Sequence, residues 1–207
     1  MNLIDNTGTN RVIDVLRQAA DKDASLDIAT PTLSLFAFFE VRDLLNRASR
    51  SRLVLPLETG ADLTLLGSVA DRAARNGLQA RWLAQECAKW INTRAEVRSS
   101  SSPLPQSAYV IEHPEPARSC VITGNCPLTT DGLGLAPSNQ FSLIPCAEND
   151  DEVKLFSAWY ESLWSALPAS CAAKDQLLAR LGPIADHVPA ALIYYRIRSS
   201  RQSGVGF

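Results

Sequence analysis

Residues 25–56 read SLDIATPTLSLFAFFEVRDLLNRASRSRLVLP, and this stretch decides the fold class. Its first residues, Ser25–Ala29, form a short apolar run of strand length. Leu33–Ala48 then predicts a helix, and a threonine or serine hydroxyl at its start can cap the first turn. A second apolar run, Arg52–Leu57, predicts another strand. Strand, helix and strand in this order are typical of an α/β protein whose sheet is covered by helices.

The rest of the chain first alternates helices with strands and then brings several strands together. Apolar residues at helical or strand spacing predict helices over 10–20, 63–76, 78–92, 151–166, 172–181 and 189–198, and strands over 96–98, 108–112, 119–123 and 140–144. This order predicts an α/β fold with a mixed β-sheet flanked by helices and a short helical C-terminal appendage. We expect one domain over residues 1–167 and the appendage with its tail over 168–207.

Composition excludes several classes of protein. The 207 residues are 46% apolar, which is enough to build a substantial core, and the formal net charge is -2, so the chain is not strongly basic. The five cysteines form no Cys-x-x-Cys pair, which disfavours a zinc site and a disulfide framework and favours free thiols in a reducing cytoplasm. The N-terminus lacks an apolar signal region, and no run of about 18 apolar residues is present, so we expect a cytoplasmic protein without a membrane segment.

Five further stretches extend a pattern over nearly the whole chain. They are AYVIEH at 108–113, CVITGNCPLTTDGLG at 120–134, SNQFSLIP at 138–145, LFSAWYESLW at 155–164 and VPAALIYYRI at 188–197. Together with residues 25–56, they resemble the phospholipase-D-like domain family. The resemblance is closest to the domains that lie N-terminal to Swi/Snf-type helicases in bacterial defence or repair loci, and it implies a phospholipase-D-like sandwich.

The resemblance breaks at the family's catalytic motif. Active members need a histidine nucleophile and a phosphate-binding lysine in an HxK motif, and these positions fall on Pro105 and Ser107. The asparagine of the family's GSxN segment falls on Pro127, while Glu112 lies where the motif has an aspartate. The two histidines of the chain, His113 and His187, have no HxK context. From this departure we predict a chain that is not an enzyme and that needs no metal and no cofactor.

Other residues near the expected cleft leave alternatives open. The segment Gly124-Asn125-Cys126 either cups an anion with its backbone N–H groups or forms a tight turn, and a turn is the simpler interpretation. Cys126 is a nucleophile only if a nearby cation or helix start lowers its pKa, and the sequence shows no base at recognisable spacing. The acidic run Asp150–Glu152 suits the first turn of a helix better than a metal site.

Arginines are clustered along the chain, and the hypothesis of nucleic-acid binding rests on these clusters. Guanidinium groups suit phosphate oxygens, so several of them on one face would bind a nucleic-acid backbone. The alternative is a solvated helix face whose charge is diluted by neighbouring carboxylates. The predicted nucleic-acid contacts are Arg47, Arg50, Arg52 and Arg98.

The main functional hypothesis is a non-catalytic phospholipase-D-like subunit that scaffolds a DNA-associated assembly, with a helicase, translocase or defence-complex subunit as its protein partner. The alternatives are a DNA-binding module that uses the former phosphate cleft and a phosphodiesterase or nuclease with a non-standard site. Because family members pair two half-sites, the resemblance also implies a homodimer. The apolar segment after Pro189 predicts a docking helix, and the expected partner contacts are Tyr194, Tyr195, Arg196 and Arg198.

Apolar periodicity also predicts the core. Buried positions recur on one side of each expected strand and helix, and the aromatic residues of 151–166 are more typical of packing than of base stacking. The expected core residues are Phe38, Leu44, Val54, Val110, Ile111, Val121, Ile122 and Trp159.

Overall fold

The fold is built on a seven-stranded mixed sheet with the order β1-β7-β6-β5-β2-β3-β4. The structure is a computed structural model, and it describes residues 1–60, 62–67, 71, 77–136, 143–169 and 171–187. The strands are β1 (Asn2–Ile4), β2 (Ser25–Ala29), β3 (Arg50–Leu55), β4 (Ala95–Ser99), β5 (Ser107–Glu112), β6 (Cys120–Gly124) and β7 (Ile144–Ala147). The helices are α1 (Val12–Ala19), α2 (Leu35–Arg47), α3 (Gly77–Thr93), α4 (Asp150–Ala166) and α5 (Ala172–Ala185).

The sheet has a parallel half and an antiparallel half. β2, β3 and β4 are parallel, with α2 and α3 on the connections between them. β5 then runs antiparallel beside β2, and β6, β7 and β1 continue the antiparallel half. Helical crossovers of this kind are required because parallel neighbours cannot be joined by a tight turn. The predicted class, a mixed sheet flanked by helices, is confirmed.

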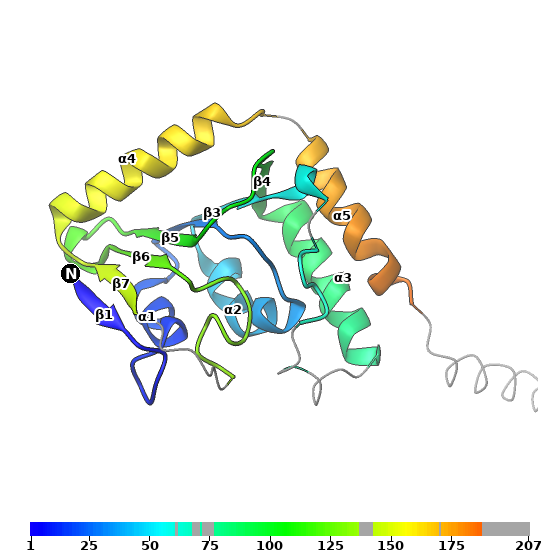
Figure 1. Ribbon diagram of the computed structural model, residues 1–207, viewed down its shortest axis with the longest axis horizontal. Coiled ribbons are helices and arrows are strands. Elements are labelled where there is room, and N and C mark those ends of the chain that lie inside the picture. Colours follow the sequence, from blue (N-terminus) through cyan, green and yellow to red (C-terminus); the bar gives the residue numbers. More distant parts are fainter. Residues whose placement is uncertain (61, 68–70, 72–76, 137–142, 170, 188–207) are drawn as a thin grey trace, which may run out of the picture.

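The two faces of the sheet are covered unequally. Figure 1 shows α4 crossing one face alone, while α1, α2 and α3 cover the other face and α5 lies beside α3. The main core lies between the sheet and α1, α2, α3 and α5, and a smaller cluster under α4 contains Val54, Val110, Val153, Tyr160 and Trp164. α4 is therefore the whole helical cover that the described residues provide for its face.

Several predicted elements differ in the structure. β1 has only three residues, too few for an apolar pattern to reveal it. Most of the strand expected at 140–144 lies outside the described residues, and β7 is observed at Ile144–Ala147. Residues 63–67 are not helical, and the rest of the helix expected at 63–76 lies almost entirely outside the described residues. The helix expected at 189–198 lies outside them as well.

The position of α5 departs from the expected appendage. Its side chains Ala173, Leu177 and Leu181 belong to the main core. Lys174 donates to the carbonyl of Asn92 at 3.1 Å, which ties α5 to the end of α3. Through residue 185, the described part of the segment after 168 is thus packed with the domain that precedes it.

The core prediction is confirmed for seven of the eight residues and is wrong for Trp159. Phe38, Leu44, Val54, Val110, Ile111, Val121 and Ile122 are buried, whereas Trp159 is 46% exposed. The buried face of α4 is set by Val153, Tyr160 and Trp164, which are spaced by seven and four residues. Trp159 lies one residue before Tyr160, and a single residue turns a side chain by about 100° around a helix axis. The neighbouring tryptophan, Trp164, takes the buried position instead.

The cysteines are free, and four of the five are buried. Burial raises the pKa of Cys126 to about 12, so this possible nucleophile is a protonated thiol at neutral pH. Burial also raises the pKa of Cys87. Cys171, just before α5, is the exposed thiol. None of the helices in the described residues is both long and apolar enough to cross a membrane.

We expect a thiol reagent to label one cysteine rapidly in the native protein and five after denaturation. The reason is that thiolates react and thiols do not, and four of the sulfur atoms are shielded in the core. The measurement is a time course with a chromogenic disulfide, with and without denaturant. A Cys171→Ser variant is the control and should lose the rapid phase. Rapid labelling of Cys126 would contradict its burial.

Candidate functional site

The two segments that carry the family resemblance do meet in the structure. Ser107 at the start of β5 pairs with Gly124 at the end of β6. Ser107 is fully buried, and its Oγ lies 3.2 Å from Oγ1 of Thr30. Thr30 donates that hydroxyl to the carbonyl of Thr32 and accepts the N–H of Leu128, each at 3.0 Å, so Ser107 is the donor between the two hydroxyls. These neutral groups satisfy one another and form a closed structural cluster.

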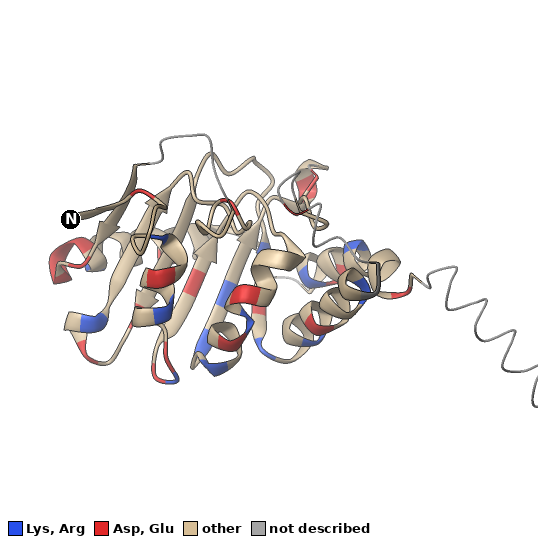
Figure 2. Ribbon diagram, turned by 90° about the horizontal axis from the view of Figure 1, so that it is seen from below, with Lys and Arg blue, Asp and Glu red and all other residues tan. Residues whose placement is uncertain are grey.

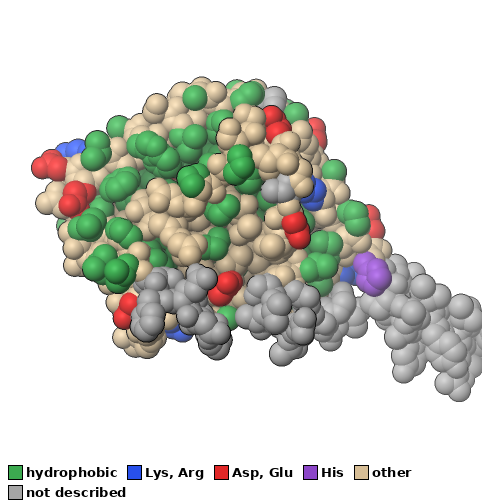
Figure 3. All heavy atoms as spheres, viewed as in Figure 1, with side chains coloured by type: hydrophobic (Ala, Val, Ile, Leu, Met, Phe, Trp, Pro, Cys, Tyr) green, Lys and Arg blue, Asp and Glu red, His purple; other side chains and the backbone are tan. Residues whose placement is uncertain are grey.

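The turn that follows β6 is also satisfied internally. The N–H of Cys126 donates to the carbonyl of Gly124 at 2.9 Å, and the hydroxyl of Tyr109 donates to the carbonyl of Cys126 at 2.8 Å. The amide of Cys126 therefore closes a turn and does not point to an anion. Figure 3 shows this end of the sheet, where hydrophobic side chains are numerous and charged ones few among the described residues in view.

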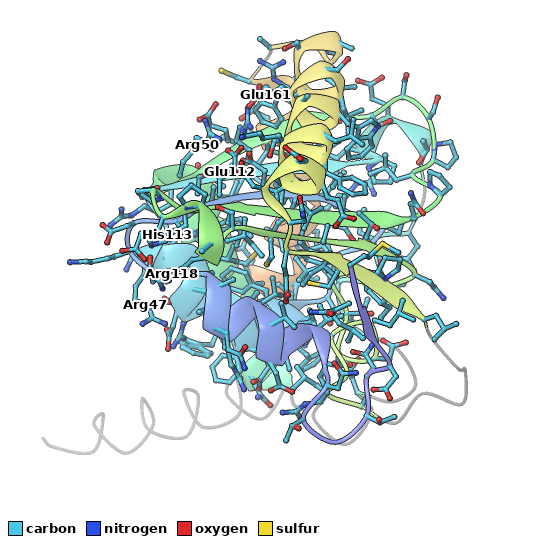
Figure 4. The ribbon with its side chains drawn as sticks, turned by 90° about the vertical axis from the view of Figure 1, so that its left-hand side faces the viewer. Arg47, Arg50, Glu112, His113, Arg118 and Glu161 are labelled. Carbon is cyan, nitrogen blue, oxygen red and sulfur yellow. The ribbon has the colours of Figure 1, made fainter. Side chains whose placement is uncertain are left out.

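Charged residues gather at the opposite end of the sheet, where β2 and β3 begin. Figure 2 shows both signs of charge along this lower end, and Figure 4 shows Arg50, Glu112, His113 and Arg118 in a column down one edge. A groove of about 400 Å³ opens here, and it is lined by Asp23, Ser25, Ser49, Arg50, Glu112, His113 and Pro114. We call it the charged groove.

The topology explains why these residues meet. Ser25 and Glu112 are cross-strand partners in the β2–β5 pair, so the loop before β2 and the loop after β5 lie side by side. β3 is parallel to β2, which brings Arg50 to the same end. Sequence patterns did not reveal Asp21, Asp23 and Arg118. In the sequence these residues stand in two polar loops, Ala20–Ala24 and His113–Ser119. Only the strand register shows that the two loops lie together.

His113 is the centre of a tight ion-pair cluster. Its Nδ1 accepts the backbone N–H of Glu115 at 2.9 Å, and its Nε2 lies 3.3 Å from Asp21. Arg118 donates to the second oxygen of Asp21 at 2.6 Å and contacts the imidazole at 2.9 Å. The imidazole side chain is 4% exposed. His113 thus fixes the loop after β5 and presents no free nitrogen to the groove.

Asp21 is strongly ionised in this setting. The backbone N–H of Asp23 and then the guanidinium of Arg118 lower its pKa to about 2. Asp21, Asp23 and His113 hold potential ligand atoms within 4.8 Å of one another, which is a spacing that a metal ion could use. Arg118, however, already places its positive charge on Asp21, so the group is better described as an ion-pair cluster.

Of the four predicted nucleic-acid contacts, Arg52 is used inside the protein. Its guanidinium donates to both oxygens of Asp27, at 2.8 and 2.5 Å, and to both oxygens of Glu161 on α4. It also lies 5.1 Å from the ring centroids of Tyr160 and Trp164. Burial works against its charge, but the bonds to Asp27 and Glu161 prevail and raise its pKa. Arg52 fastens α4 to the sheet.

Arg98 has a related structural role. It lies against the ring of Trp164, 4.4 Å from the centroid, and donates to the carbonyls of Trp164 and Leu167. These carbonyls are at the C-terminal end of α4, where backbone acceptors have no partner within the helix and positive charge is favourable. Arg98 therefore caps α4.

Arg47 and Arg50 remain at the surface: Arg50 lines the charged groove, and Arg47 lies further along the same edge. Arg47 donates its Nε to the carbonyl of Asp43 at 3.0 Å. Arg50 donates one terminal nitrogen to Asp27 at 3.1 Å, and the same nitrogen lies 3.8 Å from Glu112. Its other two nitrogens have no hydrogen-bond partner among the described residues, and its side chain is 41% exposed. Guanidinium groups with free donors are the chemistry that binds phosphate.

The fold is that of an α/β protein with a groove of mixed charge at this end of the sheet. A comparison with solved structures returned NucT from Helicobacter pylori, with a TM-score of 0.45 and 9% sequence identity over 77% of this chain and 88% of that chain. No protein-family model matches the chain, and no curated protein does.

The prediction that this chain is not an enzyme is corrected. The physical reason is that Pro105 and Ser107 remove one catalytic arrangement, and the loss of one arrangement does not exclude another elsewhere in the chain. The missing motif is therefore no ground for assigning the chain to the non-enzymes.

The expected partner contacts Tyr194, Tyr195, Arg196 and Arg198 lie outside the described residues. A docking role for them, with a helicase or a defence-complex subunit as partner, stays a prediction.

Proposed function

We propose that the protein is a phospholipase-D-like nucleic-acid-binding protein that takes a backbone phosphate at the charged groove. The observation that carries this proposal is the guanidinium of Arg50, which lines the groove, is 41% exposed and keeps two nitrogens free of partners among the described residues. Arg47 is three residues away in sequence, in the last turn of α2, and its terminal nitrogens are also without partners among those residues. In Figure 4 the two arginines lie at opposite ends of the labelled column, with Glu112, His113 and Arg118 between them, so each guanidinium suits a different phosphate of the backbone.

The charges around Arg50 limit the number of phosphates that we expect the groove to bind. Arg118 adds a third guanidinium, 38% exposed, whereas Asp23 and Glu112 place carboxylates in the same groove. A mixed field of this kind attracts a nucleic-acid backbone only over a short stretch. The proposal is therefore a local contact with two or three phosphates, with the former cleft at Ser107 and Gly124 left aside because its polar groups are satisfied internally.

The test is binding of labelled single-stranded and duplex DNA measured by fluorescence anisotropy at several salt concentrations. We expect the logarithm of the affinity to fall with the logarithm of salt at a slope of roughly 2, since each neutralised phosphate contributes about 0.7–0.9. Arg50→Gln should weaken binding about tenfold at low salt and reduce the slope by about 1. Glu112→Gln should strengthen binding because it removes a competing carboxylate.

The matched control is Arg11→Gln. Arg11 precedes α1 at the opposite end of the sheet and pairs with Asp14 at 2.7 Å, so this variant loses the same charge far from the groove. Circular dichroism confirms that each variant is folded, and a denaturing gel of the bound DNA reports cleavage in the same samples. Equal weakening by Arg11→Gln and Arg50→Gln would show that net charge, and not the groove, governs binding.

A further inference from the structure

Two aromatic side chains are exposed next to each other on the face of the sheet where α2 and α3 lie side by side (Figure 1). Phe39 on α2 is 38% exposed, and Trp82 on α3 is 43% exposed. Their ring centroids are 5.8 Å apart, and the two rings meet edge to face. Together with Arg42, which contacts both rings, they form a surface that we call the aromatic patch. Neighbouring large apolar groups that the described part of the chain leaves exposed are typical of interaction sites.

Arg42 fixes the geometry of the aromatic patch. The carbon of its guanidinium lies 5.2 Å from the ring centroid of Phe39 and 5.4 Å from that of Trp82. Two of its nitrogens lie 3.4 Å from one oxygen of Asp43, and the third has no hydrogen-bond partner among the described residues. A guanidinium attracted to two rings restricts the movement of both. The patch therefore presents preformed ring surfaces together with a donor nitrogen.

The exposed side of α2 joins the aromatic patch to the arginines near the charged groove. Asn46 is seven residues after Phe39, so the two residues share one face of the helix, and both are exposed. Arg47, also exposed, is eight residues after Phe39, which is about 12 Å along the helix axis. A stacked strand advances by about 3.4 Å per nucleotide. A strand with one phosphate at Arg47 therefore reaches the patch within about three or four nucleotides.

The charges around the patch favour contact with bases over contact with phosphates. Lys89 lies seven residues after Trp82 on the exposed side of α3, but Asp43 and Glu86 add a carboxylate on each helix. A mixed field of this kind gives little attraction for a row of phosphates. Exposed aromatic rings beside a guanidinium are instead the groups on which unpaired bases stack, and every base offers a π-face for this contact. A base inside a duplex is already covered on both faces by its neighbours.

We propose that the aromatic patch stacks unpaired bases of a single strand whose phosphates contact Arg47 and Arg50. This inference rests on the nucleic-acid binding proposed for the charged groove, and it makes the substrate class single-stranded. Phe39 and Trp82 supply the stacking surfaces, and Arg42 holds the two rings in place. A duplex contacts the arginines alone, so the single strand binds more tightly.

The test is fluorescence anisotropy with three labelled DNA probes of about 12 nucleotides: an oligothymidylate, an abasic strand with the same phosphates, and a duplex. Trp82→Ala should weaken binding of the oligothymidylate about tenfold, because one stacked base loses its ring. The same variant should leave binding of the abasic strand unchanged. It should also leave the salt dependence unchanged, because no phosphate contact is lost, whereas Arg50→Gln should reduce it.

Two variants serve as controls for Trp82→Ala. Trp82→Phe keeps an aromatic ring at this position and should retain most of the affinity for the oligothymidylate. Trp159→Ala removes a tryptophan that is 46% exposed on α4, which crosses the other face of the sheet, and it should leave binding of all three probes unchanged (Figure 1). Circular dichroism checks that each variant is folded.

Three outcomes would overturn the proposal. They are equal affinities of the unsubstituted protein for the oligothymidylate and the abasic strand, equal weakening of these two probes by Trp82→Ala, and equal weakening of the oligothymidylate by Trp159→Ala and Trp82→Ala. The abasic strand tests the charged groove separately. If Arg50→Gln binds that strand as well as the unsubstituted protein does, the groove is wrong, while a loss specific to the oligothymidylate in Trp82→Ala still supports the patch.

Discussion

Replacing Asp27 with alanine is expected to lower the free energy of unfolding by about 3–5 kcal/mol, which is the usual cost of leaving one buried charge without its partner. Asp27 is 1% exposed and Arg52 is 5% exposed, and they are direct neighbours in the parallel β2–β3 pair. Without Asp27, the buried guanidinium keeps Glu161 as its sole carboxylate partner among the described residues. The expected loss therefore lies near the lower end of the range, and urea unfolding at equilibrium measures it.

Two further variants show whether the loss of stability in Asp27→Ala comes from the buried ion pair. The double variant Asp27→Leu with Arg52→Met removes both charges together and should restore much of the stability, because an apolar pair of similar volume needs no partner. Asp43→Ala, at an exposed carboxylate on α2, should change the stability by less than about 0.5 kcal/mol. A loss in Asp27→Ala no larger than in Asp43→Ala would contradict the buried ion pair.

Much of the framework could be predicted from residues 25–56, because strand and helix periodicities are local. The same stretch also contained Asp27 and Arg52, each a lone charge inside an apolar run. A buried charge needs a partner, and the parallel register supplies one. The third member, Glu161, is more than a hundred residues away on α4, and local patterns carry no information on such a distant contact.

The candidate site was predicted only in part for the same reason. Arg47 and Arg50 were predicted, together with Arg52 and Arg98, as nucleic-acid contacts, because clustered arginines are visible in the sequence. Arg52 and Arg98 have the same residue type, and only their contacts with α4 separate them from Arg47 and Arg50. The sequence cannot distinguish an arginine that faces water from one that faces a carboxylate in the core.

The sequence predicts the bounds of α4 closely but not which of its tryptophans is buried, and the orientation of the helix can be tested directly. Trp164→Ala is expected to lower the free energy of unfolding by about 3–5 kcal/mol through lost burial and the cavity left behind. Trp164 is 7% exposed, stacks on Tyr160 with centroids 6.2 Å apart and contacts the guanidinium groups of Arg52 and Arg98. Each cation–π contact adds about 0.5–1 kcal/mol to the loss.

Trp159→Ala is the matched control on the same helix. Its ring is 46% exposed, so its removal from the monomer should cost less than about 1 kcal/mol. Both variants are unfolded with urea at the same protein concentration. Because the two substitutions are chemically identical, their difference reports only which side of α4 faces the sheet. A larger loss of unfolding free energy in Trp159→Ala than in Trp164→Ala would mean that the helix is rotated about its axis. Arg52 and Arg98 would then not hold α4 through Trp164.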